Sequence, residues 1–299
     1  MNQQPPSRLG ELLMKLFIMT IMNGLTLAAL YFLVASGFTL VFGLMRNVNL
    51  AHGSLYLLGA YIGFVVIETS GSWLLGVGAG FLSMAIMGLL FQVCIFRRIE
   101  GQDLRQTMIT IGISIILADV MLAIWGGTTY QLMIPDALYG AVRLPVVGAY
   151  TIYRLFILGA AVVIGLALWL FLTRTQVGMK IRAGVDDKDM LAATGVNVHR
   201  VFAIVFAIGA GLAGLAGVVG GSALSIAPGE DVRYLLASLV VVIVGGMGSL
   251  GGAALGSLLI GLAEQFGLAY APTYGVVYTF IIMVVTLAFR PQGFFGRKA

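Results

Sequence analysis

Residues 174–221, RTQVGMKIRAGVDDKDMLAATGVNVHRVFAIVFAIGAGLAGLAGVVGG, decide how this chain is organised. The first part of the stretch is charged: basic residues run from Arg174 to Arg200, around the acids Asp186, Asp187 and Asp189. The second part, 201–221, has no charged residue and is rich in Gly and Ala, and the chain on both sides is almost free of charge. A charged, helix-compatible segment between membrane spans indicates a docking surface rather than a substrate site.

The composition is that of an integral membrane protein. Of 299 residues, 60% are hydrophobic and 10% are charged, whereas a soluble domain has about 25% charged residues. Glycine is abundant, with 41 residues against 7 prolines, and this favours close helix packing in a membrane. The net charge of +5 fits basic residues in short cytoplasmic loops, so no nucleic-acid partner is expected.

Apolar runs, uncharged except for Asp119 and Glu264, predict an all-α bundle of about eight or nine membrane spans, because one span needs about 20 apolar residues. The runs cover 16–45, 47–67, 73–96, 107–125, 155–172, 201–221, 235–247, 252–268 and 274–289. The first run exceeds one straight span, which predicts either a tilted helix or a break near Ser36 and Gly37. We therefore divide the chain into a tail 1–15, one transmembrane domain 16–290 that contains the charged loop 174–200, and a tail 291–299.

The basic residues in short loops predict the orientation. They gather at 97–105, at 174–200 and at 290–298, and an even number of crossings separates each pair of these clusters. All three clusters can then be cytoplasmic, which places the C-terminus inside. The same count places the N-terminus outside, although Arg8 and Lys15 argue the other way, so this end stays open.

The long loop 126–153 lies on the opposite side. Its second half alternates and is rich in β-forming residues around Gly148, which predicts a short β-hairpin outside the membrane. This lip is either a seat for a soluble receptor or an inert connection.

A stripe of small residues marks the run 201–221. Gly209, Ala213, Gly217 and Gly221 are spaced four apart, with Ala210 and Gly214 beside them. Such stripes let helix backbones touch. We therefore expect this helix at the centre of the bundle or at a subunit interface.

Glycines interrupt the run that starts at Tyr234. The segment GGMGSLGG (245–252) formally matches GxGxxG, but a dinucleotide fold needs soluble βαβ units that the chain lacks. Each glycine weakens a helix by roughly 1 kcal/mol relative to Ala. The segment therefore predicts a broken helix, and Gly245, Gly246, Gly248 and Gly251 would line a cavity.

Polar residues open the second run. Asn49 can cap a helix that starts at Leu50, and His52 lies one turn before Tyr56 on the same face. Polar groups at membrane depth often mark a pathway, although a lone histidine is more often a packing residue. Since the other histidine, His199, lies in the charged loop, no metal site is expected.

Two more acids, Asp119 and Glu264, lie in or near apolar runs. A proton-coupled carrier would need such groups beside a basic partner in the membrane, and the sequence shows no such partner. It also shows no Ser/His/Asp or Cys/His set arranged for hydrolysis. We therefore expect no enzyme activity from this chain.

Three segments resemble LivH-type permeases, the membrane subunits of ABC importers for branched-chain amino acids. They are GFTLVFGLMRNVNLAHGSLYLLGAY (37–61), residues 178–218 and VVVIVGGMGSLGGAALG (240–256). The resemblance covers the chain from about residue 15 and implies alternating access in a bacterial inner membrane. It implies as partners a second homologous permease subunit, two cytosolic ATPases that hold the ATP, and a periplasmic binding protein, with no cofactor on this chain.

The resemblance also assigns residues. It implies that 185–196, VDDKDMLAATGV, is the short helix that seats on the ATPase. The coupling residues would be Asp186, Asp187, Asp189, Ala192, Ala193 and Gly195, and the 49–56 and 245–252 segments would line or gate the passage. The chain departs from the pattern at Leu191, where ABC importers at large have Glu, and at Ser54, where many relatives carry an acid.

Other functions stay open at this stage. The same architecture could import urea, short amides or a sugar. A self-sufficient secondary carrier would use Asp119 or Glu264, and a nucleotide-dependent membrane enzyme would use Gly246 and Gly248.

Overall fold

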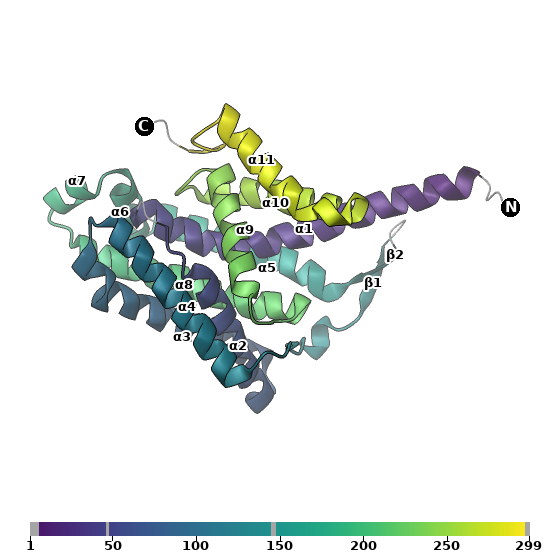
Figure 1. The fold of residues 1–299 in the computed structure, drawn as a ribbon, viewed down its shortest axis with the longest axis horizontal. Coiled ribbons are helices and arrows are strands. Elements are labelled where there is room, and N and C mark those ends of the chain that lie inside the picture. Colours follow the sequence, from purple (N-terminus) through teal and green to yellow (C-terminus); the bar gives the residue numbers. More distant parts are fainter. Residues whose placement is uncertain (1–5, 46–47, 145–147, 297–299) are drawn as a thin grey trace.

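The computed structural model describes residues 6–45, 48–144 and 148–296 and shows a helix bundle with one short β-hairpin (Figure 1). The helices are α1 (Pro6–Met45), α2 (His52–Ser70), α3 (Trp73–Cys94), α4 (Asp103–Trp125), α5 (Ile152–Arg174), α6 (Gln176–Asp186), α7 (Lys188–Ala193), α8 (Val198–Leu224), α9 (Glu230–Gly245), α10 (Leu250–Tyr270) and α11 (Gly275–Phe289). Short 3-10 turns lie at Phe96–Ile99, Asp136–Leu138 and Pro272–Tyr274. Within the described residues, seven helices are long and apolar enough to cross a membrane, so the predicted polytopic bundle is confirmed. The number is below the predicted eight or nine because α9 and α11 have only 16 and 15 residues.

Helix α1 is one continuous helix of 40 residues. The break that we considered near Ser36 and Gly37 does not occur. Gly37 instead lies against α8, where a Cβ on it would collide with the carbonyl oxygen of Gly209. The glycine therefore serves a close helix contact, and α1 keeps its hydrogen-bond ladder.

Helix α8 lies at the centre of the bundle and packs on α1, α2 and α3. Its small residues are the points of contact. A Cβ on Gly214 would collide with the Gly80 oxygen of α3, and one on Gly217 would collide with the Tyr56 oxygen of α2. Gly209, Ala213, Gly217 and Gly221 are all buried. Backbone contact, which only small residues permit, therefore holds the bundle together.

We expect Gly214→Val to destabilise the bundle. The new Cβ would meet the Gly80 backbone and lie 2.6 Å from Met84 Cγ, and overpacking of this kind costs roughly 1–3 kcal/mol. Thermal melting of the purified protein in detergent measures the loss. The matched control is Gly78→Val on α3, where no atom lies within 4 Å of the added Cβ; equal melting temperatures for the two variants would contradict the packing argument.

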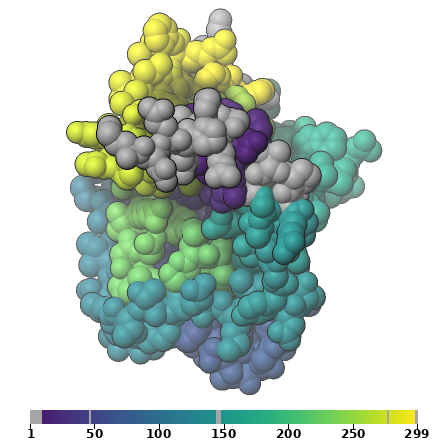
Figure 2. All heavy atoms as spheres, turned by 90° about the vertical axis from the view of Figure 1, so that its right-hand side faces the viewer, coloured from purple at the N-terminus to yellow at the C-terminus, as the bar shows by residue number. Residues whose placement is uncertain are grey.

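The predicted β-hairpin is confirmed at one end of the molecule. Strands β1 (Ala141–Leu144) and β2 (Gly148–Thr151) pair antiparallel with Ala141 opposite Thr151, and residues 145–147 lie outside the described residues. Upstream, Tyr130 and Ile226 exchange backbone hydrogen bonds of 2.9 and 2.8 Å, which join this loop to the α8–α9 connection. In Figure 2 the teal hairpin and the green connection share this end of the surface. The start of α1 lies at the same end, and α6 and α7 lie at the other (Figure 1).

The glycine-rich segment forms a tight turn between α9 and α10, so the predicted helix break is confirmed. Ser249 Oγ accepts from the Gly252 amide at 3.0 Å and starts α10. With 16 residues at about 1.5 Å each, α9 is about 24 Å long, shorter than a membrane core of about 30 Å. Its last carbonyls bond to the C-terminal segment, Phe294 N to Val244 O at 3.0 Å and Phe295 N to Gly245 O at 2.9 Å.

Candidate translocation and coupling site

We name α6, α7 and the residues up to 196 the coupling segment, after the role that the resemblance implies. The end of the bundle that carries this segment is the coupling end (Figure 1). The short helix expected over 185–196 covers only Lys188–Ala193, because Asp187 ends α6 and caps α7. Its Oδ1 accepts from the amides of Asp189 at 2.9 Å and Met190 at 3.0 Å. Aspartate is a strong helix-capping residue, and this cap sets the angle between the two helices.

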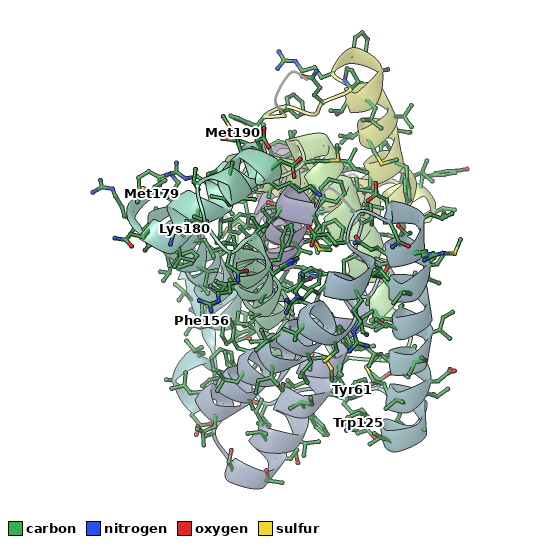
Figure 3. All side chains as sticks on the ribbon, turned by 90° about the vertical axis from the view of Figure 1, so that its left-hand side faces the viewer. Tyr61, Trp125, Phe156, Met179, Lys180 and Met190 are labelled. Atoms are coloured by element: carbon green, nitrogen blue, oxygen red, sulfur yellow. The ribbon has the colours of Figure 1, made fainter. Side chains whose placement is uncertain are left out.

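Helix α7 turns small residues outward. Leu191 is buried against the bundle, whereas Ala192, Ala193 and Gly195 are exposed, and Gly195 ends the helix with φ +82°. Met190 beside them is 69% exposed and stands out at this end with Met179 and Lys180 (Figure 3). Flexible methionines on a surface suit adaptable contacts with a partner.

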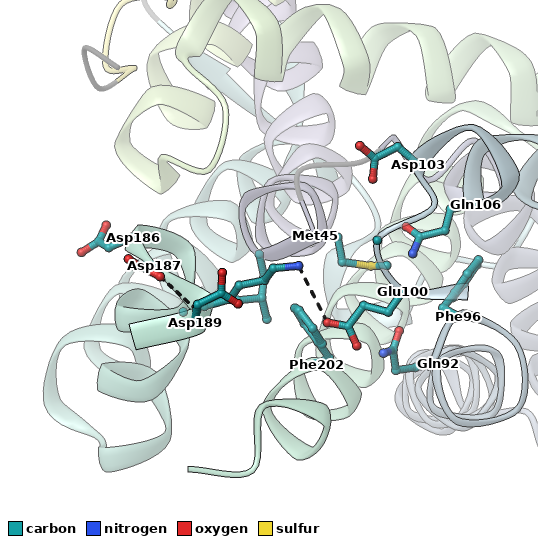
Figure 4. Close-up of a pocket in the computed structure, with 14 residues that line it drawn as sticks. Met45, Gln92, Phe96, Glu100, Asp103, Gln106, Asp186, Asp187, Asp189 and Phe202 are labelled. Carbon is teal, nitrogen blue, oxygen red and sulfur yellow. Dashed lines mark hydrogen bonds and ion pairs between the residues drawn. The ribbon is translucent and has the colours of Figure 1, made fainter. Parts of the chain in front are cut away.

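A cavity of about 420 Å³ lies between the coupling segment and the connection from α3 to α4 (Figure 4). Its carboxylates are Glu100, Asp103, Asp186, Asp187 and Asp189. Glu100, which sequence reasoning missed, lies 3.2 Å from His199 Nδ1 and 4.0 Å from Lys188 Nζ. It therefore ties the α3–α4 connection to the coupling segment.

Asn49 does not cap a helix from Leu50, because α2 begins at His52. Its Oδ1 accepts instead from the Ala51 amide at 3.2 Å, so the side chain shapes the turn two residues before the helix. The predicted cap is wrong in position, although the residue does satisfy a backbone amide.

His52 and Tyr56 join α2 to its neighbours. His52 is fully buried, with Nε2 3.1 Å from Val34 O of α1 and its ring edge-on to Phe38. Tyr56 packs on the Tyr234 ring of α9, with centroids 4.1 Å apart. In the single chain both side chains make packing contacts between helices, and their place along the passage stays a prediction.

The glycines of the broken helix lie at the coupling end. Gly245 faces Gly252 so closely that a Cβ would collide, Gly246 meets the C-terminal segment, and a Cβ on Gly248 would lie 3.6 Å from Val185 Cγ1 of α6. Gly251 has no atom within 4 Å of an added Cβ. It is exposed and lines an apolar groove between α1, α5 and α10.

Glu264 has the basic partner that the sequence did not reveal. Arg233 of α9 places Nη2 3.4 Å from Glu264 Oε1 and Nη1 3.6 Å from Glu230 Oε2. Tyr31 of α1 donates to Glu264 Oε2 at 2.6 Å. The expectation that no cation accompanies this acid is wrong, because the α9–α10 hairpin brings together residues 31 positions apart.

A second acid stands next to this pair. Asp231 is buried and accepts from Ser54 Oγ at 3.1 Å, and Ser54 also contacts Ser114 Oγ of α4 at 3.1 Å. Although the chain has no acid at position 54, α9 therefore supplies one beside it. Asp119 is exposed on α4.

The head of α9, residues 230–234, is thus the polar centre that sequence reasoning missed. The apolar run in the sequence begins at Tyr234, immediately after these charged residues. The available signal was a lone arginine that follows two acids at the edge of an apolar run, because ionisable groups at membrane depth are functional candidates.

Comparison with known proteins identifies the family. Residues 20–287 match the family described as the permease component of the branched-chain amino acid transport system. The chain is 30% identical to the high-affinity branched-chain amino acid permease BraD of Pseudomonas aeruginosa and 31% identical to LivH of Escherichia coli, each over 94% of this chain and 96% of the relative. It is also 28% identical to a putative glucose ABC transporter permease of Haloferax volcanii, over 67% of this chain and 62% of the relative. The chain belongs to the LivH-type permease components of branched-chain amino acid ABC transporters, whose permease subunits are not the ATPase.

Proposed function

We propose that this chain forms part of the passage of an importer for branched-chain, hydrophobic amino acids in a bacterial inner membrane. A second homologous permease subunit would complete the passage, two cytosolic ATPases would drive it and a periplasmic binding protein would deliver the substrate. The observation that carries the proposal is near-complete alignment with BraD and LivH, 94% of this chain in each case. The glucose permease relative supports a sugar as the second candidate substrate.

The coupling end of the bundle faces the cytoplasm in this proposal. Basic residues gather there, from Arg174 to Arg200, as the positive-inside bias requires. The glycine turn touches α6 and the C-terminal segment, which supports a cytoplasmic C-terminus in this proposal. The start of α1 and the β-hairpin would then face the periplasm and the binding protein.

Movement of the ATPases is transmitted from α7 through α6 to the glycine turn. Ala192, Ala193 and Gly195 seat on the ATPase, and Asp186, Asp187 and Asp189 line the cavity beside them. Because Gly248 lies between Val185 of α6 and Gly43 of α1, a rigid-body shift of α6 pushes on both α1 and the α9–α10 hairpin. Movement of these helices between two arrangements gives alternating access.

Uptake by the reconstituted importer tests the proposal. The chain is assembled with its candidate ATPases, second permease subunit and binding protein in proteoliposomes, and labelled leucine and labelled glucose are compared. We expect leucine uptake that needs both ATP and the binding protein. Uptake of glucose alone would favour the second candidate, and leucine uptake by this chain alone under an ion gradient would reveal a secondary carrier.

A further inference from the structure

One face of α9 is exposed and has a charged head above an apolar stripe. Val232, Leu236, Leu239 and Ile243 repeat at intervals of four, three and four residues, so they share a face. Val232 and Leu236 are 53% and 43% exposed, and Leu239 and Ile243 are partly exposed. Arg233 stands next to the top of this stripe with its side chain 49% exposed.

The charged head lies at membrane depth. The turn after Gly245 is at the coupling end, and Arg233 is twelve residues up α9, about 18 Å away. Its partners Glu264 and Tyr31 belong to α10 and α1, both of which are long enough to span a membrane. An exposed ion pair at this depth is costly against lipid and normally faces water or protein. The exposed face of α9 is therefore turned away from lipid, as a face that borders the passage would be.

The guanidinium group of Arg233, in the charged head of α9, can bind a further carboxylate. Strong charge-assisted hydrogen bonds to a carboxylate measure about 2.7–2.9 Å, whereas Arg233 lies 3.4 and 3.6 Å from its two carboxylates. The planar guanidinium binds a carboxylate with two parallel hydrogen bonds. Glu230, one turn before Arg233 on α9, is 33% exposed and offers a negative group beside it.

We propose that Arg233 and Glu230 form a subsite for the zwitterionic head of an α-amino acid inside the passage. Arg233 binds the α-carboxylate, Glu230 binds the α-ammonium group, and the stripe from Val232 to Leu239 receives an apolar side chain. Glu264 is a positioning residue: Tyr31 fixes it at 2.6 Å, and it in turn holds the guanidinium. This inference rests on the proposed function and adds to it a recognition step within the permease.

The first test separates recognition from charge balance. In the complete importer in proteoliposomes, Arg233→Gln is expected to lower leucine uptake at least about tenfold, and Arg233→Lys, which keeps the charge without the planar fork, to lower it less. The double variant Arg233→Gln/Glu264→Gln leaves no unpaired charge on α10 and is expected to stay as defective as Arg233→Gln. If the double variant restores uptake, Arg233 only neutralises Glu264 and the subsite is disproved.

The second test asks whether water and substrate reach the stripe. Leu236→Cys is introduced together with Cys94→Ser, which removes the exposed native thiol, and the complex is treated with a charged methanethiosulfonate. We expect labelling that saturating leucine slows, and an unlabelled or unprotected thiol would overturn the inference. If the wild-type importer moves no leucine, the proposed function itself fails; if it does and the Arg233 variants match it, only the subsite fails.

Discussion

Replacing Ala193 with arginine is expected to lower ATP-driven uptake at least about tenfold without unfolding the protein. Ala193 is exposed on α7, so the larger side chain meets no neighbour in the isolated chain. On the proposed ATPase contact it would hold the short helix away from its seat. Central interface residues contribute about 2 kcal/mol or more, and each 1.4 kcal/mol is a factor of about ten in binding.

The matched control for this variant is Ala183→Arg. Ala183 is also exposed and helical, but it lies on α6, outside the 185–196 segment. Both variants are compared for melting temperature, for recovery of the ATPase with the purified permease, and for uptake. Equal uptake for the two would show that α7 is not the ATPase contact.

The second large effect is expected from Gly245→Ala, which adds one methyl group at the closest approach of α9 and α10. That methyl group would collide with the Gly252 oxygen. Because this oxygen belongs to the backbone and the position of a Cβ is set by its own backbone, the hairpin must open. Overpacking costs roughly 1–3 kcal/mol, and the opened turn would lose its contact with α6. We expect a lower melting temperature and little uptake.

Gly251→Ala in the same segment is the control. Gly251 lies within α10 and has open space around it, so alanine there is expected to keep uptake and to raise helix stability by up to about 1 kcal/mol. The two glycines were indistinguishable in the sequence as candidate passage residues. If both alanine variants lost uptake equally, backbone contact would not be the reason for Gly245.

The sequence was sufficient for the bundle, the β-hairpin and the broken helix, because each has a local signal. Apolar run length sets the spans, alternation around Gly148 sets the hairpin, and glycine density sets the break. The sequence does not show which glycines break a helix and which allow a close contact with a neighbouring helix. Gly37 could have broken α1, but it instead lies against Gly209 of α8. That outcome depends on which helix lies opposite.

The polar centre at the head of α9 could not be predicted from the sequence, for a related reason. Glu264 looked unpaired because its partners, Arg233 and Tyr31, come from different helices. The sequence predicted a local polar group of Asn49, His52 and Tyr56. In the structure Asn49 accepts from the Ala51 amide, and His52 and Tyr56 contact neighbouring helices. Local spacing thus identifies candidate residues, and the order of helices in space decides which of them meet.

The bonds from Phe294 and Phe295 to the end of α9 have a consequence for biosynthesis. A helix leaves its last four carbonyl groups without internal partners, and here two of them, on Val244 and Gly245, bond to the amides of Phe294 and Phe295, about fifty residues later in the chain. Helices α9 and α10 are translated well before those amides. The Gly245 end of α9 therefore completes its hydrogen bonding only after residues 294 and 295 have been made, and a chain cut before Phe294 would leave these two carbonyl groups without those partners.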